Sequence, residues 1–173
     1  MAPTTAPGKA GSILDGSWRV APDSSRIDFR LRLLGVIPTK GGFRDFTGEL
    51  DVDPVEGAVG LLRVEVASIE TGNARRDKHL CSENFFEVEK YPVAWFNLDK
   101  VSSVAGGTTI SGTLRIRDRE MVIHTPATVS PAAEGSLRIA TALDLDPRKA
   151  GFTFKPLPKS VRIQLELTLY RVG

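Results

Sequence analysis

Residues 68–96 interrupt a chain of otherwise two-residue alternation and read SIETGNARRDKHLCSENFFEVEKYPVAWF. The Thr-Gly-Asn run at 71–73 favours a turn and can cap a helix, and residues 74–82 suit a short helix that needs packing to be stable. Tyr91-Pro92 returns the chain to extended geometry, because proline disfavours the helical conformation in the residue before it. A short helical insert is therefore expected at about 72–90, between the strands that precede and follow it.

Two-residue alternation occupies most of the remaining chain. In residues 26–33 every second position is apolar and the positions between them hold arginine or aspartate, which is typical of a strand with one wet face. Residues 35–42 are expected to form a loop because they contain Pro38 and paired glycines. Similar alternation predicts strands at 17–20, 26–33, 43–52, 62–66, 94–99, 108–117, 121–129, 137–145 and 161–169.

Eight or nine such strands have to cover one apolar face and their own edges. Closure into an antiparallel barrel does both, whereas a sandwich would bury the same face, so the alternation alone does not choose between them. The inward positions include small residues, namely Gly48, Ala94, Gly112, Thr125, Ala127 and Thr141. Such residues fit either a packed core or a barrel with an open lumen.

Short motifs follow one another along the chain: residues 68–73 (Ser-Ile-Glu-Thr-Gly-Asn), Arg76-Asp77 with His79-Leu80, residues 84–88 (Asn-Phe-Phe-Glu-Val), Lys90-Tyr91-Pro92 and Phe96, with Phe43, Phe46 and Gly48 upstream and residues 112–116 (Gly-Thr-Leu-Arg-Ile) downstream. In this order they resemble the YceI-like family, the polyisoprenoid-binding domain proteins. The resemblance extends over about the whole chain after residue 15. It implies an all-β fold, an antiparallel eight-stranded lipocalin-like barrel with an open lumen that holds a long isoprenoid chain.

Two segments depart from the family pattern. Residues 118–120 (Asp-Arg-Glu) replace a turn of glycine and a small apolar residue, and Ala150 stands where an aromatic residue is expected. Either Phe152 or Phe154 takes the place of that aromatic residue, or the pocket has a different shape here.

The expected function is non-catalytic binding, storage or transport of a polyisoprenoid or an isoprenoid quinone inside the barrel. This lipid is the expected ligand, and no cofactor, catalytic residue or metal ligand is assigned. Phe85 and Phe86 either line the mouth or fasten the insert to the barrel. The residues expected to contact the lipid are Ile27, Phe29, Leu31, Leu33, Phe46, Leu50, Val64, Val66, Phe85, Phe86, Phe96, Leu98, Leu114, Ile116, Ile123, Ile139, Leu143, Ile163 and Leu165.

Two other classes of function compete with lipid binding. One is a solid-cored module that binds a protein through the insert and its charged residues at 75–78. The other is a cryptic hydrolase with Cys81 as nucleophile and His79 as base, which is disfavoured because residues two apart on a helix point to different sides. A homodimer is a further possibility, since Trp95 falls on an outward face.

Composition limits the remaining classes. The formal net charge of +2 comes from nearly balanced residues without a basic run, which argues against a nucleic-acid partner. The single cysteine cannot form an internal disulfide, no apolar run is long enough to span a bilayer, and the first residues lack a secretory signal, so a cytoplasmic protein is expected although relatives are often periplasmic or secreted. Residues 1–15 are expected to be a disordered tail and residues 16–173 a single barrel domain.

Overall fold

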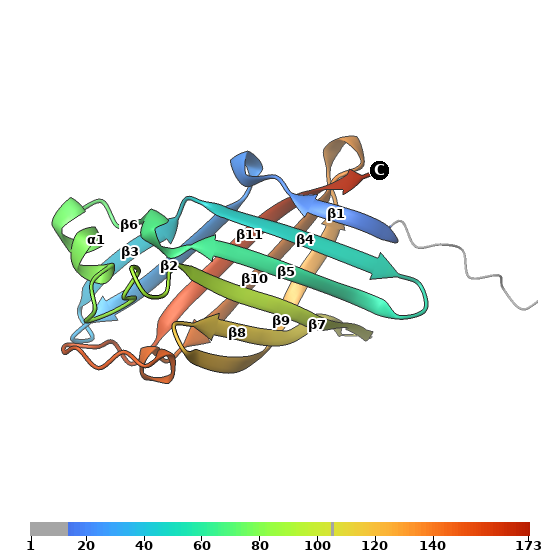
Figure 1. Cartoon of the computed structure of the whole chain (residues 1–173). Helices are drawn as coiled ribbons and strands as arrows, with labels where there is room; N and C mark the ends of the chain where they lie inside the picture. The colour runs from blue at the N-terminus through green and yellow to red at the C-terminus, as the bar shows by residue number, and fades with distance from the viewer. Residues whose placement is uncertain (1–13, 105) are drawn as a thin grey trace, which may run out of the picture.

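The computed structural model describes residues 14–104 and 106–173, in which eleven strands belong to one antiparallel sheet (Figure 1). The strands are β1 (Gly16–Val20), β2 (Arg26–Leu33), β3 (Ile37–Phe43), β4 (Phe46–Asp53), β5 (Gly57–Glu65), β6 (Ile69–Glu70), β7 (Val93–Val104), β8 (Gly107–Ile116), β9 (Arg119–Pro131), β10 (Leu137–Leu145) and β11 (Val161–Val172). The α-helix α1 spans Ala74–Leu80. Short 3-10 turns lie at Pro22–Ser24, Val66–Ser68, Ala133–Gly135 and Pro147–Ala150.

The sheet closes on itself through β11. The order β1-β4-β5-β7-β8-β9-β10-β11 returns to β1, so within the described residues eight strands form a ring. Residues 169–172 of β11 pair with β1, and residues 161–166 pair with β2. The predicted eight-stranded antiparallel barrel is therefore confirmed.

A break divides the first strand into β1 and β2, and Ser25 bridges it. The Ser25 hydroxyl donates to the Ala21 carbonyl at 2.6 Å and accepts the backbone N–H of Thr168 at 2.9 Å. The N–H of Ala21 donates to the carbonyl of the same Thr168 at 2.8 Å. Since the buried polar groups at the break are paired, β1 and β2 behave as two halves of one strand against β11.

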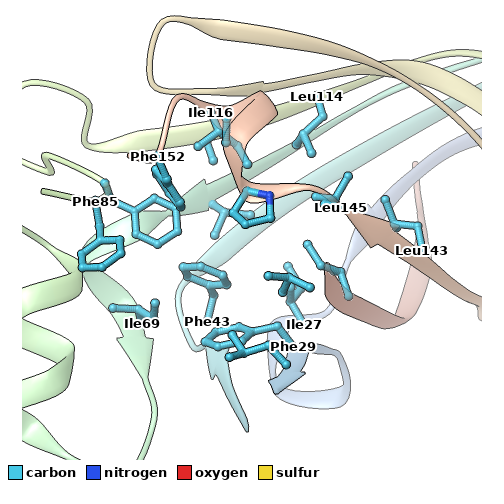
Figure 2. Close-up of a pocket in the computed structure, with 18 of the residues that line it drawn as sticks. Ile27, Phe29, Phe43, Ile69, Phe85, Leu114, Ile116, Leu143, Leu145 and Phe152 are labelled. Atoms are coloured by element: carbon cyan, nitrogen blue, oxygen red, sulfur yellow. The ribbon is translucent and has the colours of Figure 1, made fainter. Parts of the chain in front are cut away.

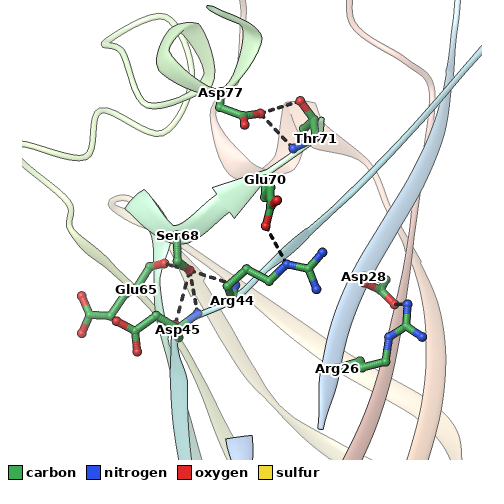
Figure 3. A network of polar contacts seen from close by, with 9 residues as sticks. All are labelled: Arg26, Asp28, Arg44, Asp45, Glu65, Ser68, Glu70, Thr71 and Asp77. Atoms are coloured by element: carbon green, nitrogen blue, oxygen red, sulfur yellow. Dashed lines mark hydrogen bonds and ion pairs between the residues drawn. The ribbon is translucent and has the colours of Figure 1, made fainter. Parts of the chain in front are cut away.

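A second break, between β3 and β4, is held by Ser68, the first residue of the quoted stretch (Figure 3). The Ser68 hydroxyl accepts the N–H of Arg44 at 3.2 Å and the N–H of Asp45 at 3.0 Å. It also donates to the Glu65 carbonyl at 2.6 Å. Glu70 then pairs with Arg44 at 2.8 Å, so the β5–β6 bend and the β3–β4 bend are joined.

The prediction of a loop at 35–42 is wrong, because β3 occupies most of it. Gly41 faces Phe29 across the β2–β3 ladder, and a Cβ at Gly41 would lie 2.6 Å from the Cζ of Phe29 and 2.7 Å from the Glu70 carbonyl oxygen. A Cβ at Gly42 would lie 2.8 Å from Asp28 Oδ1. The glycines therefore admit close neighbours within a strand and do not mark a turn.

The helical insert is confirmed, and it is shorter than the segment expected to contain it. The Asn73 side chain caps α1 by accepting the N–H of Arg76 at 3.0 Å. Asp77 accepts both the N–H and the hydroxyl of Thr71, which holds the first turn against the end of β6 (Figure 3). Residues 81–92 continue as consecutive turns before β7.

A solid core fills the end of the barrel that lies away from α1. Trp18, Phe46, Leu137 and Leu169 are each exposed by 3% or less, and they pack in one cluster with Val20, Ile27 and Leu50. Residues 1–13 of the expected tail lie outside the described residues. Leu14 packs against this core, and its carbonyl accepts the indole N–H of Trp18 at 2.8 Å.

Replacing Gly112 with alanine is expected to destabilise the barrel. The added Cβ would lie 2.1 Å from the Asn97 carbonyl oxygen and 2.7 Å from the Cζ of Phe96, at the bulge between β7 and β8. We expect Gly112→Ala to lower the free energy of unfolding in urea by about 1–3 kcal/mol, the usual effect of overpacking. Gly106→Ala is the matched control, since its Cβ would meet no atom within 4 Å; equal losses in both variants would contradict the prediction.

Candidate ligand-binding cavity

A cavity of about 410 Å³ occupies the end of the barrel next to α1 (Figure 2). Its walls come from β2, β3 and β5 to β11, and its cover comes from α1, from Phe85 and Phe86, and from residues 146–158. This volume falls in the range of about 300–1,000 Å³ that is usual for small-molecule sites. The solid core closes the opposite end of the barrel, so the cavity is blind.

Most residues expected to contact a lipid line this cavity. They come from both sides of the barrel and from the insert, and Figure 2 shows several of them pointing toward a common space. They are Ile27, Phe29, Leu31, Leu33, Val64, Phe85, Phe86, Phe96, Leu114, Ile116, Ile123, Leu143, Ile163 and Leu165.

The other five expected contact residues lie elsewhere. Phe46 and Leu50 are buried in the solid core, and Leu98 and Ile139 pack against it. Val66 is buried in the 3-10 turn between β5 and β6. Phe46, Leu50, Leu98 and Ile139 face inward as predicted, but they pack against other side chains of the protein and do not line the cavity. Val66 lies between Val64 and Ile69, which line the cavity, and is itself not part of the lining.

A row of aromatic rings leads from the barrel wall to the cover of the cavity. Phe29 and Phe43 have centroids 5.8 Å apart, Phe43 and Phe86 6.0 Å, and Phe86 and Phe152 5.0 Å. Phe85 contacts Phe152 at 5.9 Å and Phe154 at 5.4 Å. The Phe pair therefore both lines the mouth and fastens the insert to the barrel, so the two interpretations apply together.

Sequence reasoning missed part of the lining. Phe43 and Ile69 were not assigned because they fall at the bend where the strand pattern breaks. Phe152 and Phe154 lie in an irregular segment without periodicity, and both line the cavity. Further missed residues of apolar character are Leu62, Leu80, Ala94, Ile110, Met121, Leu145, Leu157 and Val161.

The small inward residues divide between the two ends of the barrel. Ala94, Thr125 and Thr141 line the cavity. Gly48 lies in the solid half, where a Cβ would come within 2.6 Å of Val20. The packed core and the open lumen are both present, each at its own end.

Several polar groups of the cavity lining have protein partners. The Thr125 and Thr141 hydroxyls donate to backbone carbonyls at 3.1 and 2.8 Å. Arg76 donates to the hydroxyl and the carbonyl of Thr71 at 2.8 and 2.7 Å. Asp28 pairs with Arg26 at 3.0 Å. The hydrogen bond from the Arg148 side chain holds the pKa of Asp146 below its ordinary value. The lining thus carries few charges: Asp28 and Asp146 are paired with arginines, and Arg76 donates to neutral oxygens of Thr71.

Arg117, in the β8–β9 turn, fixes the segment after α1 to the barrel. Its guanidinium donates to the Phe85 carbonyl at 3.1 Å and pairs with Glu87 at 3.2 Å. It also lies 5.8 Å from the centre of the Tyr91 ring. Because the Arg117 side chain is only 19% exposed, these contacts are sheltered from solvent and hold the aromatic cover in place.

The environment of Cys81 does not favour the thiolate form that a thiol nucleophile needs. Burial, and to a smaller extent the charge of Asp77, raise the pKa of the Cys81 thiol. His79 contacts the rings of Phe85 and Phe154 at 5.2 and 4.9 Å. A raised pKa lowers the thiolate fraction at neutral pH, and the thiolate is the reactive form.

Three further features bear on the expectations from sequence. Trp95 is partly buried, and the guanidinium of Arg63 lies over its ring at 5.2 Å. Among the described residues, no group of three or more His, Cys, Asp or Glu side chains could hold a metal ion. In the same part of the chain, no helix combines the length and apolar character needed to cross a membrane.

A closed antiparallel barrel with a blind apolar cavity defines the lipocalin-like class of β-barrels. Within this class, the YceI-like domain family matches residues 18–169. The chain belongs to the YceI-like family.

A UPF0312 protein of Yersinia enterocolitica is 33% identical over 111 residues, covering 62% of this chain and 58% of that protein. A UPF0312 protein of Photorhabdus laumondii is 37% identical over 93 residues, 52% of this chain and 48% of that protein. The chain therefore spans about half the length of these relatives.

Solved structures share the fold. BcnA of Burkholderia cenocepacia has a TM-score of 0.75 at 19% identity, covering 86% of this chain and 98% of that one. A YceI protein of Campylobacter jejuni has a TM-score of 0.66 at 25% identity, covering 75% and 83%. A domain of Saccharophagus degradans described as polyisoprenoid-binding has a TM-score of 0.75 at 14% identity, covering 90% and 98%.

Removing the Arg117 guanidinium is expected to loosen the cover of the cavity. Arg117→Met deletes the contacts to Phe85 and Glu87 and keeps an apolar stem. Amide hydrogen exchange in residues 82–91 should become faster by about tenfold or more, while the strands keep their protection. Arg115→Met, at an exposed position on β8, is the control; unchanged exchange in the Arg117 variant would show that the segment does not depend on the Arg117 contacts.

The raised pKa of the Cys81 thiol predicts how the rate of its alkylation depends on pH. The rate of alkylation by iodoacetamide should rise with pH around a midpoint above that of the same chain unfolded in urea, because the folded protein keeps the thiol protonated longer. The midpoint is a better readout than the absolute rate, since it does not depend on how easily the reagent reaches the sulfur. A midpoint below that of the unfolded chain would restore Cys81 as a candidate nucleophile.

Proposed function

We propose that this chain binds a long apolar isoprenoid lipid, a polyisoprenoid or an isoprenoid quinone, and stores or transports it without changing it chemically. The observation that carries the proposal is the blind, apolar cavity of about 410 Å³ inside the barrel. A cavity of this kind suits a ligand that is mostly hydrocarbon. The polyisoprenoid-binding description of the Saccharophagus degradans domain, which has the same fold, supports the choice of ligand.

Burial of hydrocarbon supplies the binding energy. Each methylene transferred from water to an apolar lining contributes about 0.8 kcal/mol. Even partial burial of an isoprenoid tail can therefore exceed the cost of ordering it. Because hydrocarbon burial has no preferred direction, we expect selectivity for chain length to be weak.

The mouth of the cavity favours an uncharged or weakly charged headgroup. Arg76 is the cation of the lining, and its Nε and Nη2 already donate to Thr71. Asp28 and Asp146 also line the cavity, and each is paired with an arginine, Arg26 and Arg148 respectively. A neutral quinone or alcohol headgroup needs no charged partner, so it fits a lining whose few charged groups are already engaged.

Solvent extraction of the purified protein tests the proposal. Under denaturing conditions, mass spectrometry of the organic extract should find about one isoprenoid lipid per chain. An apo preparation should also take up added ubiquinone or polyprenol. A folded protein that releases no apolar lipid and takes up neither probe would contradict the proposal and favour an interaction module.

A variant that fills the cavity links the lipid to this site. Ala94 on β7 lines the cavity beside its cross-strand neighbour Val64 on β5. The phenyl ring of Ala94→Phe would therefore fill part of the cavity. We expect lipid content to fall by about tenfold or more with the fold retained, because the remaining volume no longer admits the chain. Val122→Phe is the control, since Val122 is 86% exposed on the outer face of β9.

A further inference from the structure

The tip of the β2–β3 hairpin exposes a group of large apolar side chains at the hollow end of the barrel. Leu34 is 71% exposed, Val36 70% and Ile37 51%. Leu34, Val36 and Ile37, with Gly35 between the first two, form the feature that we call the apolar tip. Phe154 adds a side chain that is 39% exposed in the segment covering the cavity.

The local turn does not account for a leucine at position 34. The Val36 N–H donates to the Leu33 carbonyl at 3.1 Å, and both residues between them have positive φ, 53° at Leu34 and 74° at Gly35. Asn-Gly is the preferred pair for such hairpin turns, because asparagine tolerates positive φ better than a bulky residue. The hairpin therefore carries an exposed leucine at a position where folding alone favours a polar residue.

The apolar tip continues the lining of the cavity. Leu31 and Leu33 on the same strand line the cavity, and Leu34 follows directly. Val161 pairs with Leu31 across β2 and β11, so the segment ending in Pro158 arrives beside this hairpin. Figure 1 shows the β2–β3 tip and this segment at the same end of the barrel, with α1 above them. Apolar residues therefore follow β2 from the cavity lining at Leu31 and Leu33 to the exposed tip.

Positive charge surrounds the apolar tip. Residues 30–40 carry Arg30, Arg32 and Lys40 and no acidic residue. Residues 146–159 carry four basic residues against Asp146, which is paired with Arg148 at 2.9 Å. The formal net charge of the whole chain is only +2, so the β2–β3 hairpin and residues 146–159 carry more than their share of the cations.

The hairpin at the opposite end provides an internal comparison. The β4–β5 turn exposes Val55 by 79% and Val59 by 54%. Residues 49–57 around it contain four acidic residues and no basic residue. Figure 1 shows this turn at the far end from α1. Exposed valines therefore occur at both ends, but only the hollow end combines them with cations and with the cavity.

We propose that the apolar tip docks on the surface of an anionic lipid bilayer, with Leu34 and Val36 entering the headgroup region and Arg30, Arg32 and Lys40 contacting acidic headgroups. The inference rests on the proposed function, since it supplies the route by which a water-insoluble lipid reaches the cavity. Apolar side chains flanked by lysine and arginine are the combination that binds an anionic membrane interface. A protein partner or a second copy would need the apolar surface but not the concentration of cations around it.

Vesicle flotation tests the docking. The purified full chain should bind vesicles of phosphatidylcholine with phosphatidylglycerol at least about tenfold more tightly than vesicles of phosphatidylcholine alone, and the difference should shrink as salt is raised. The double variant Leu34→Asn/Val36→Thr should lose about tenfold or more of the binding to the mixed vesicles. It creates an Asn-Gly turn and keeps a β-branched residue at 36, so its unfolding midpoint should equal or exceed that of the parent.

The matched control is Val55→Thr, at an equally exposed valine in the acidic hairpin, and it should leave vesicle binding unchanged. Equal binding by the parent and the double variant would overturn the proposal, as would the absence of vesicle binding by the parent. A double variant that instead converts a dimer to a monomer in sedimentation would assign the tip to a second copy. Extraction separates the two proposals: lipid without vesicle binding leaves only the proposed function, and vesicle binding without extractable lipid leaves only the docking.

Discussion

The pairing of β11 with both halves of the broken first strand is the constraint on which the rest of the structure depends. Its residues from Val161 hold β2, its last residues hold β1, and Ser25 fills the hydrogen-bonding gap between them. A closed sheet has no free edge, and all inward side chains must share one enclosed space. The solid core and the cavity therefore share the interior of one barrel. The side chain at each inward position decides whether that part of the interior is packed or hollow.

The division between solid and hollow ends follows from where large side chains meet. Trp18 and Phe46 fill the lumen at one end, whereas Ala94 and Thr141 leave it wide at the other. There the rings of the insert and of residues 152–154 cover the space without filling it. An apolar cavity costs stability when it is empty, and a ligand that binds the folded state recovers stability. A barrel built in this way gains from an occupant.

The alternation of the strands was sufficient to predict which residues face inward, and the motifs in residues 68–96 placed the chain among barrels with a helical insert. Alternation carries no information about depth along the barrel axis, so Leu50 and Leu143 were assigned the same role although one packs in the core and the other lines the cavity. β3 was missed because Gly41 serves close packing against Phe29, a contact that only the register reveals. Phe154 lies in irregular chain, where no period exists to detect.

The position of the cover relative to the apolar tip constrains how a hydrocarbon chain could move. The insert is tied to the barrel by polar contacts at its two ends, Asp77 with Thr71 and Arg117 with Phe85 and Glu87, while ring contacts hold the middle. Ring contacts are non-directional and can be exchanged for contacts with an isoprenoid chain at little cost. Polar contacts cannot be exchanged in this way. Under the proposed docking, a lipid would therefore pass between the aromatic rings and the β2–β3 hairpin, where the exposed apolar tip directly follows Leu31 and Leu33 of the cavity lining.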